Sequence, residues 1–293
     1  MPQSNRRYVL LSTAIGLAIG LTIGGMKLHR DGYLFPTPDA ALIVAVQEGH
    51  GDRAASLLAR GANPNERDKE GYPVLATAAQ KNEAEAAEAL LEHGADLEAR
   101  DSFGYTPLMI AAENGSAYAA KILLDHGANV DADNTGTPIY FAAVDGSVAV
   151  AKLLLDRGAP LEAKDDLGRT PLYAAADFDH ADLVLFLLQR GANPKARDNN
   201  GVPMLTNAAS QPSVDAVRVL LEHGAPANDP TSDGDTALME AAKIGSVEIG
   251  ELLVGHGADV NARDDDGNTA LYYAEKAGRN DFVALLKQHG ASQ

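Results

Sequence analysis

The sequence contains no cysteine and no tryptophan among its 293 residues, and aromatic residues make up only 5%. Without cysteine the chain has no disulfide framework, no thiol nucleophile and no cysteine ligand for a metal. This absence is compatible with an oxidising or a reducing compartment. Apolar residues nevertheless reach 45%. We therefore expect a core built from small aliphatic side chains, mainly alanine and leucine.

Positive charge is also scarce, with 24 lysines and arginines against 41 aspartates and glutamates and a net charge of −17. An acidic domain repels nucleic acid and anionic lipid, so we expect no nucleic-acid partner. One interpretation, which we favour, is that this charge keeps the domain soluble. The alternative is that it selects a basic protein partner.

Catalytic signatures are missing as well. No G-x-S-x-G, H-E-x-x-H, P-loop or dinucleotide fingerprint occurs, and serines and histidines follow no triad pattern. The acidic run Asp264–Gly267 is an incomplete calcium loop, because the EF-hand spacing needs an oxygen ligand where Ala262 stands. We therefore expect no enzymatic activity, no cofactor and no metal site.

The N-terminal part holds one long apolar run, residues 8–26, which contains no charged residue. Nineteen residues of helix span roughly 28 Å, close to the thickness of a bilayer core. The run predicts a single transmembrane helix, with residues 1–7 as a short basic tail and residues 27–38 as a linker. The alternative is a cleaved signal peptide. Signal peptides usually have a shorter apolar region and a small-x-small cleavage site after it, which is absent here, so we favour an uncleaved anchor.

Basic residues flank this run on both sides, Arg6 and Arg7 before it and Lys27 and Arg30 after it. The positive-inside rule therefore discriminates only weakly between the two orientations. The short basic tail favours an N-terminus inside the cell. In a bacterium, that orientation places the rest of the chain in the periplasm.

Glycines recur every four residues inside the predicted span, at Gly16, Gly20 and Gly24. They share one helix face, where the backbone of a second helix can approach closely. One interpretation is a contact between membrane helices, including a homo-oligomer. The alternative is that glycine is simply common in membrane helices.

A period of 33 residues runs through the remainder of the chain. Gly-Ala pairs recur in steps of 33, with one step of 31, and begin at Gly61, Gly94, Gly127, Gly158, Gly191, Gly224, Gly257 and Gly290. Such a fixed period is the signature of a repeat protein. In the clearest copy we expect Thr106 to cap a helix that begins at Pro107. Gly115 suits the turn to a second helix that ends at Gly127, and Asp101-x-x-Gly104 suits a hairpin-like finger.

Thr-Pro-Leu or a close variant starts at Thr106, Thr137, Thr170, Thr236 and Thr269. The pattern resembles the ankyrin repeat and its T-P-L-H-x-A core. The resemblance covers about residues 39–293 in eight repeats. Pro73 and Pro203 replace the threonine in the second and sixth repeats, and the family's histidine is missing throughout. The resemblance implies an all-α solenoid of helix–turn–helix units with β-hairpin-like fingers. We expect the first and last repeats to act as caps with polar outer faces.

The glycine between the two helices of a repeat is also replaced at three places, by Asn82, Asp179 and Pro212. Glycine suits this turn because it adopts positive φ without steric strain. We expect the three replacements to bend or loosen the stack.

Five of the eight histidines precede the helix-ending glycine, namely His93, His126, His223, His256 and His289. The other three repeats have Arg60, Arg157 and Arg190 at this position. A cation at a helix C-terminus meets the negative end of the helix dipole and can bond free carbonyls. Neighbouring repeats stand about 8–10 Å apart, too far for two rings to share a zinc ion. We therefore interpret these histidines as structural.

In ankyrin proteins, as the resemblance implies, partners bind a concave surface formed by the fingers and the first helix of each repeat. Side chains there that the fold does not require are candidate binding residues. They are Tyr72, Gln80, Lys81, Phe103, Tyr105, Glu113, Asn114, Leu167, Arg169, Asp177 and Phe178. Large exposed apolar side chains are typical of binding hot spots. The alternative is that Phe103 or Leu167 packs on a neighbouring finger.

These features predict a membrane-anchored ankyrin-repeat module that binds a protein partner, as a scaffold, tether or inhibitor, and catalyses no reaction. We expect a single-pass protein with its repeats on the outer face of a bacterial inner membrane. The alternative function is a secreted repeat protein, released by signal cleavage, that binds a foreign or host target. Detection of the N-terminal peptide in the mature protein distinguishes the two.

Overall fold

The computed structural model describes residues 22–23, 26–28, 34–131 and 136–292. The chain divides into two compact units. Unit 1 contains residues 1–111 and 118–128, and unit 2 contains residues 112–117 and 129–293. The boundary therefore passes through one helix and the turn that follows it.

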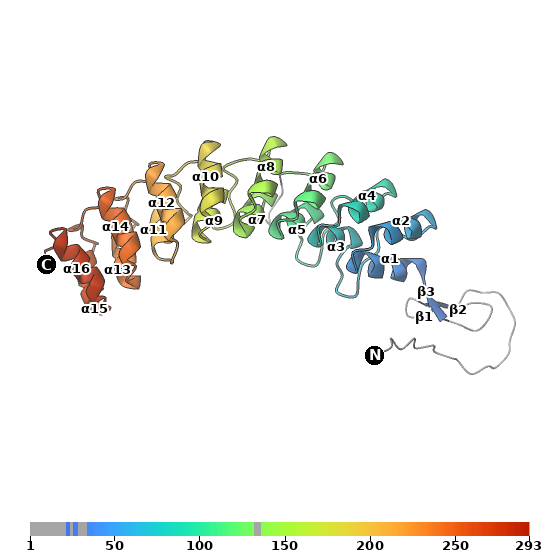
Figure 1. The fold of residues 1–293 in the computed structure, drawn as a ribbon, viewed down its shortest axis with the longest axis horizontal. Helices are drawn as coiled ribbons and strands as arrows, with labels where there is room; N and C mark the ends of the chain where they lie inside the picture. The colour runs from blue at the N-terminus through green and yellow to red at the C-terminus, as the bar shows by residue number, and fades with distance from the viewer. Residues whose placement is uncertain (1–21, 24–25, 29–33, 132–135, 293) are drawn as a thin grey trace. The chain divides into compact units, whose positions relative to one another are not determined.

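Sixteen helices in the described residues form eight helix–turn–helix pairs, numbered here as repeats 1 to 8 (Figure 1). Repeats 1 to 3 comprise α1 (Pro38–Gln47), α2 (Gly51–Ala59), α3 (Val74–Gln80), α4 (Ala84–Glu92), α5 (Pro107–Glu113) and α6 (Ala117–Asp125). Repeats 4 to 8 comprise α7 (Pro138–Asp145), α8 (Val148–Asp156), α9 (Pro171–Asp177), α10 (Ala181–Gln189), α11 (Met204–Ala209), α12 (Val214–Glu222), α13 (Ala237–Ile244), α14 (Val247–Gly255), α15 (Ala270–Lys276) and α16 (Asn280–Gln288). The prediction of a helical repeat fold is confirmed for the described residues from Pro38 onward.

Three short strands precede the helices: β1 (Thr22–Ile23), β2 (Met26–Leu28) and β3 (Leu34–Pro36). They form an antiparallel sheet in the order β1-β2-β3, with Ile23 opposite Met26 and Lys27 opposite Phe35. Where the predicted membrane span is described, the backbone is therefore strand rather than helix. The rest of that span, including Gly16, Gly20 and Gly24, lies outside the described residues. No helix in the described ranges is long and apolar enough to cross a membrane.

In most repeats the first helix starts as the sequence predicts. Thr170 accepts a hydrogen bond on its hydroxyl oxygen from the backbone N–H of Tyr173 at 3.2 Å, and Pro171 is the first helical residue. Thr106 caps α5 in the same way, through the N–H of Met109 at 3.3 Å. Capping of this kind satisfies an N–H that has no partner within the helix. Other threonines at this position, Thr236 and Thr269, also cap their helices, whereas the hydroxyl of Thr137 does not.

The turn between the two helices corrects one prediction. Glycine takes positive φ there in repeats such as repeat 4, where φ of Gly146 is 84°. Asn82 and Asp179 adopt the same left-handed conformation, with φ of 58° and 57°. Their side chains do not loosen the stack but bond the next repeat: Asp179 Oδ1 accepts the N–H of Ala216 at 2.9 Å. Asn82 Oδ1 likewise accepts two N–H groups at the start of α6, at 2.9 and 3.0 Å.

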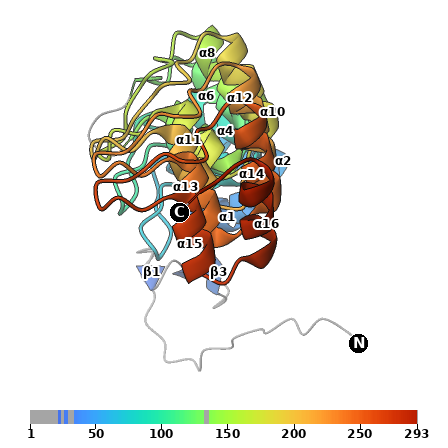
Figure 2. The same ribbon diagram turned by 90° about the vertical axis from the view of Figure 1, so that its left-hand side faces the viewer.

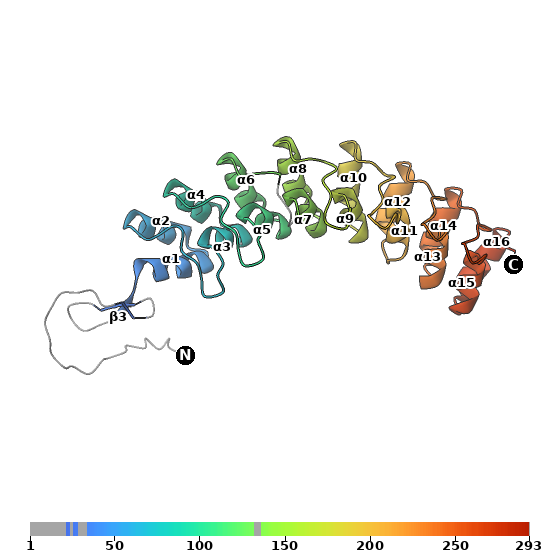
Figure 3. The same cartoon turned by 180° about the vertical axis from the view of Figure 1, so that it is seen from behind.

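Within unit 2 the helices form two rows (Figure 3). The first helices α7, α9, α11, α13 and α15 each contact the next, and so do the second helices α8, α10, α12, α14 and α16. Alanines such as Ala174 and Ala175 are completely buried between them. Small side chains allow this close approach, while Tyr173 and Phe282 are the bulkiest of the fully buried residues described. The core is therefore the alanine- and leucine-rich layer that the composition predicts.

Candidate functional site

In several repeats one side chain closes the finger that precedes the first helix. In repeat 5, Asp165 Oδ1 accepts hydrogen bonds from the backbone N–H groups of Leu167 at 3.0 Å and Arg169 at 2.8 Å. Its own N–H donates to the carbonyl of Arg169 at 3.0 Å. Asp68, Asp101 and Asp198 hold their fingers in the same way. The predicted Asp-x-x-Gly turn is confirmed, and it leaves the intervening residues at the fingertip.

Fingers in unit 2 project from the same side of the helices (Figure 2). Two pairs of them are also hydrogen-bonded. The N–H of Asn199 donates to the carbonyl of Leu167 at 2.8 Å, and the N–H of Asp265 donates to the carbonyl of Asp233 at 3.0 Å. The side chain of Asn199 donates in addition to the carbonyl of Asp166 at 3.0 Å. The backbone of these fingertips is therefore held in place by the neighbouring finger.

Two of the large apolar side chains that are exposed in unit 2 lie at a fingertip and in the turn after α9. Leu167 at the tip of the repeat 5 finger is 53% exposed, and Phe178 after α9 is 51% exposed. The ring of Phe178 stacks on that of His180, with 6.2 Å between centroids and 20° between planes. His180 pairs through Nε2 with the carbonyl of Val144 at 2.9 Å, which fixes the imidazole against repeat 4. Phe178 is therefore a positioned aromatic surface rather than a free side chain.

Arg169 and Asp177 are instead engaged within the chain. Arg169 contacts Asp165 Oδ2 through Nε at 2.9 Å and through a terminal nitrogen at 2.7 Å, and it lies 3.8 Å from Asp177. Asp177 also accepts a hydrogen bond from the side chain of Asn207 at 2.8 Å. Burial raises the pKa of Asp165, but the hydrogen bonds from Arg169 outweigh this effect and hold that pKa below its usual value. Arg169 and Asp177 thus connect the finger, α9 and α11.

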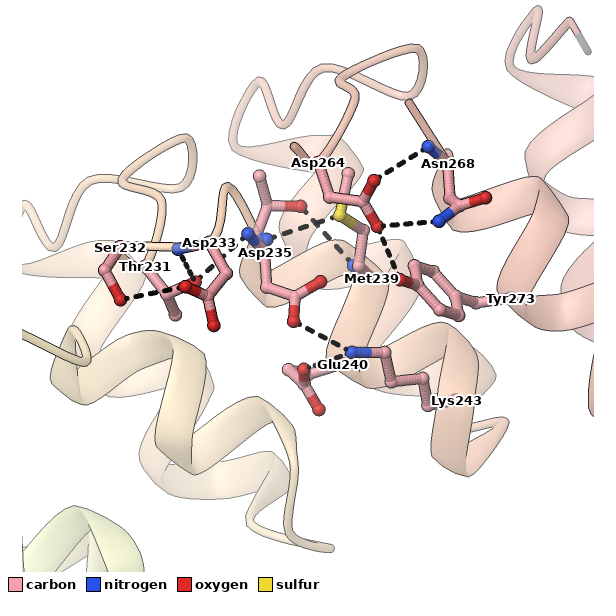
Figure 4. Close-up of polar contacts among 11 residues, drawn as sticks. Thr231, Ser232, Asp233, Asp235, Met239, Glu240, Lys243, Asp264, Asn268 and Tyr273 are labelled. Atoms are coloured by element: carbon pink, nitrogen blue, oxygen red, sulfur yellow. Dashed lines mark hydrogen bonds and ion pairs between the residues drawn. The ribbon is translucent and has the colours of Figure 1, made fainter. Parts of the chain in front are cut away.

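Repeat 7 carries the same ion pair with its charges exchanged (Figure 4). Asp235 stands where repeat 5 has Arg169, and Lys243 stands where it has Asp177; their charged atoms are 3.1 Å apart. Lys243 also reaches Glu240 at 2.8 Å and lies 4.4 Å from the ring centre of Tyr273. Burial lowers the pKa of Lys243, but the bonds to Glu240 and Asp235 outweigh it and raise this pKa. In both repeat 5 and repeat 7, an ion pair between these two positions therefore links the finger to the end of the first helix.

Tyr273 links repeat 8 to the same cluster, because Lys243 lies over its ring. Its hydroxyl donates to Asp264 Oδ2 in the finger of repeat 8 (Figure 4). This hydrogen bond, together with burial, raises the pKa of Tyr273 to about 12. Asp264 Oδ1 accepts the backbone N–H of Asn268 at 2.8 Å. The carboxylate that the sequence places in an incomplete calcium loop is thus occupied in closing the finger.

Most candidate residues of unit 1 are exposed. Phe103 is 67% exposed, and its ring centre lies 6.3 Å from that of Tyr105, which is half-buried like Tyr72. Gln80 and Lys81 are exposed at the end of α3. At the unit boundary, Glu113 and Asn114 are exposed at the end of α5. Phe103 and Leu167, for which the sequence left open packing on a neighbouring finger, are each more than half exposed among the described residues.

Sequence reasoning missed three exposed apolar side chains. Tyr118 at the start of α6 is 71% exposed, Tyr272 in α15 is 43% exposed, and Val44 in α1 is also exposed. Tyr272 occupies the position at which Tyr173 is 2% exposed. The sequence signal that could have predicted the exposure of Tyr272 was its place in repeat 8, because no further described repeat packs against it.

Three of the five helix-ending histidines have the structural role predicted for them. His93, His223 and His256 pair through Nδ1 with the carbonyl four residues earlier, at 2.8, 2.9 and 2.8 Å. His126 pairs with the carboxylate of Glu88 at 3.1 Å instead. In the part of the chain that the structure describes, no group of three or more histidine, aspartate or glutamate side chains is arranged to hold a metal.

The family model for ankyrin repeats in three copies matches residues 42–134, 129–198 and 205–293. The chain belongs to the ankyrin-repeat family. Together these matches cover nearly all of the paired helices, and such repeats are protein-interaction modules. The chain matches no curated protein.

Proposed function

We propose that this ankyrin-repeat protein binds a protein partner through the finger side of unit 2, around Leu167 and Phe178, and that it does so without catalysis. The observation that carries the proposal is that these two apolar side chains are about half exposed and yet positioned. The backbone of Leu167 is bonded to the next finger, and the ring of Phe178 stacks on an imidazole that is held by repeat 4. A pre-organised apolar side chain loses little conformational freedom on binding, which is typical of a hot spot.

Site-specific photocrosslinking in intact cells tests this proposal. A photoreactive amino acid replaces Leu167, Phe178 or, as the matched control, Tyr118, which is the most exposed aromatic residue that the structure describes and lies on a second helix. We expect one protein to crosslink at both Leu167 and Phe178 and not at Tyr118. Equal capture at all three positions, or capture at Tyr118 alone, contradicts the assignment of the binding face.

We propose further that residues 8–26 tether the module to a membrane, with the repeats in the periplasm. The support comes from the sequence alone: nineteen uncharged residues follow Arg6 and Arg7. Deletion of residues 1–30 is expected to move the protein from the membrane fraction to the soluble fraction. If the deleted protein stays with the membrane, the tether is elsewhere.

Orientation and cleavage have a direct test because the chain has no cysteine. A single Ser102→Cys substitution at an exposed fingertip gives one thiol for a membrane-impermeant maleimide. Labelling of intact spheroplasts supports a periplasmic repeat domain, whereas labelling only after lysis places it inside. Peptide mapping of the mature protein decides between the anchor and the secreted alternative, because the secreted form lacks residues 8–26.

A further inference from the structure

The fingertips of unit 2 carry carboxylates and no cation. Between the residue that closes the finger and the glycine that follows, repeats 5 to 8 have Asp166-Leu167, Asn199-Asn200, Ser232-Asp233 and Asp265-Asp266. All of these residues are exposed, and they are exposed in repeats 5 to 7 although another finger follows each of these repeats. Among the described residues, no cation lies within ion-pair distance of the four aspartates. The fingertips therefore present four unpaired negative charges.

The cations of these fingers stand at one position, directly before the closing residue: Lys164, Arg197 and Arg263. Arg197 and Arg263 each donate to the carbonyl of the glycine in their own finger, and Arg197 also bonds Asp229. Lys164 is exposed. With the first helices included, residues 163–178, 196–211, 229–244 and 262–277 contain 12 aspartates and glutamates against 6 lysines and arginines. The finger side of unit 2 is therefore acidic even when these cations are counted.

Arg169 and Lys243, two half-buried cations beside the first helices, do not offset this charge. Each is shared between two carboxylates: Arg169 between Asp165 and Asp177, and Lys243 between Asp235 and Glu240. The second oxygen of Asp235, Oδ1, is buried and has no hydrogen-bond donor among the described residues. Both clusters therefore keep an excess of negative charge.

The exposed apolar side chains stand beside these carboxylates. Leu167 follows Asp166 at the tip of the repeat 5 finger, and Phe178 follows Asp177 at the end of α9. The fingers of unit 2 project from one side of the helices, so their tips form a row (Figure 2). Neighbouring repeats stand about 8–10 Å apart, and an extended chain advances about 3.3 Å per residue. One cation in every three residues of an extended segment therefore matches the spacing of the fingers.

We infer that the finger side around Leu167 and Phe178 binds an extended basic segment of the partner protein. This inference rests on the proposed function and adds the chemistry of the partner. Lysine or arginine side chains of the segment face the fingertip aspartates, and its apolar side chains pack on Leu167 and Phe178. Each exposed ion pair contributes little affinity, but a row of them selects a basic partner and speeds its association.

A synthetic peptide of three Lys-Leu-Ser units followed by a lysine, labelled with an uncharged fluorophore, is the probe. It is titrated with the full-length protein by fluorescence anisotropy at about 0.1 M salt, where charges more than about 10 Å apart are largely screened. A peptide with glutamine in place of each lysine is titrated beside it.

Two variants that change the net charge equally separate the fingertips from the rest of the surface. The test variant neutralises three fingertip carboxylates, Asp166→Asn/Asp233→Asn/Asp266→Asn. The matched control neutralises three exposed carboxylates on second helices, Asp182→Asn/Glu222→Gln/Glu251→Gln. Leu167→Ala/Phe178→Ala tests the apolar contact, and circular dichroism confirms that all variants are folded.

We expect the lysine peptide to bind the wild type and to lose about tenfold or more in affinity for the fingertip variant, against about twofold or less for the control. The glutamine peptide and the Leu167→Ala/Phe178→Ala variant should each also weaken binding. Equal losses in the fingertip and control variants would mean that only net charge matters, and would overturn the inference. No binding of the lysine peptide, equal binding of the glutamine peptide, or unchanged binding to Leu167→Ala/Phe178→Ala overturns it as well.

Photocrosslinking in intact cells separates this inference from the proposed function. If a partner is captured at Leu167 and Phe178 with the same yield in the fingertip variant as in the wild type, the proposed function stands and the basic segment is refuted. If no partner is captured at either position in the wild type, the proposed function and the inference that rests on it both fail.

Discussion

Asp179 offers the sharpest test of how the repeats are joined, because two separate effects meet at this residue. Its backbone is left-handed, with φ of 57°, and its carboxylate accepts the N–H of Ala216, the third residue of α12, at 2.9 Å. Ser213 precedes α12 but makes no capping bond with its side chain. Asp179 therefore serves as the cap of a helix in the next repeat.

Three substitutions separate these effects. Asp179→Gly removes the cap but suits positive φ, so it should cost about 1 kcal/mol of unfolding free energy. Asp179→Ala removes the cap and keeps a β-carbon in the left-handed region without the polar group that lets aspartate tolerate it, which brings the expected cost to about 2 kcal/mol. Asp179→Asn keeps an acceptor and tolerates the conformation, so it should stay within about 0.5 kcal/mol of the wild type.

Urea unfolding followed by circular dichroism measures the three free energies, and hydrogen exchange at the Ala216 amide reports the cap itself. In a domain of this size, 1 kcal/mol corresponds to about 2–4 °C in Tm. Asp182→Ala, at an exposed residue of α10, controls for the loss of charge. Equal costs for the alanine and glycine variants would refute the strain argument. Unchanged exchange of Ala216 in Asp179→Ala would refute the cap.

Three further predictions concern the contacts within unit 2. Gly234→Ala should destabilise the protein by at least about 1 kcal/mol more than Gly267→Ala in urea unfolding. Both glycines have φ near 80°, but an added β-carbon at Gly234 would lie 2.9 Å from the Cα of Asp264, whereas Gly267 faces open space. Equal costs would contradict the close contact between the fingers of repeats 7 and 8. In a double-mutant cycle, the effects of Arg169→Asp and Asp177→Lys on unfolding free energy should couple favourably by about 0.5–1 kcal/mol, because repeat 7 carries this exchanged pair. Additive costs would show that the pair does not interact. The pKa of Asp264 is lowered, since hydrogen bonds from Tyr273 and the backbone outweigh the effect of burial. Its contribution to stability is therefore present above the unfolded-state pKa and is lost as pH falls through the folded-state value. The loss of unfolding free energy between about pH 5 and pH 3 should be smaller in Asp264→Asn, and an identical loss would contradict this assignment.

The repeat architecture could be predicted because its signals are local and occur many times. Thr170 followed by Pro171 specifies a helix start without reference to the rest of the chain, and Asp165 with Gly168 specifies a turn. The helix-ending histidines could also be assigned, since a ring at the last turn reaches a carbonyl of its own helix. These features depend on neighbours within a few residues.

The binding residues were harder to predict, because contacts across repeats decide whether such a side chain is exposed or bonded within the chain. Arg169 and Asp177 stand at positions that the fold leaves variable, but the folded chain uses them against Asp165 and Asn207. Leu167 and Phe178 stand at similar positions and remain exposed. No single-repeat pattern distinguishes these outcomes, because the partner of each side chain lies about one period away or on the next turn. The same holds for Asn82, which the sequence marks only as a missing glycine.

The central claim is that unit 2 binds a protein through its finger side. It is tested most directly by the affinity of this protein for the partner captured by crosslinking. Isothermal titration calorimetry with the purified partner compares the wild type, Leu167→Ala/Phe178→Ala and the control Tyr118→Ala. We predict a loss of about tenfold or more in the double variant, as expected when hot-spot side chains are truncated, and no change in the control. An unchanged affinity in the double variant, or a comparable loss in Tyr118→Ala, would contradict the proposed face.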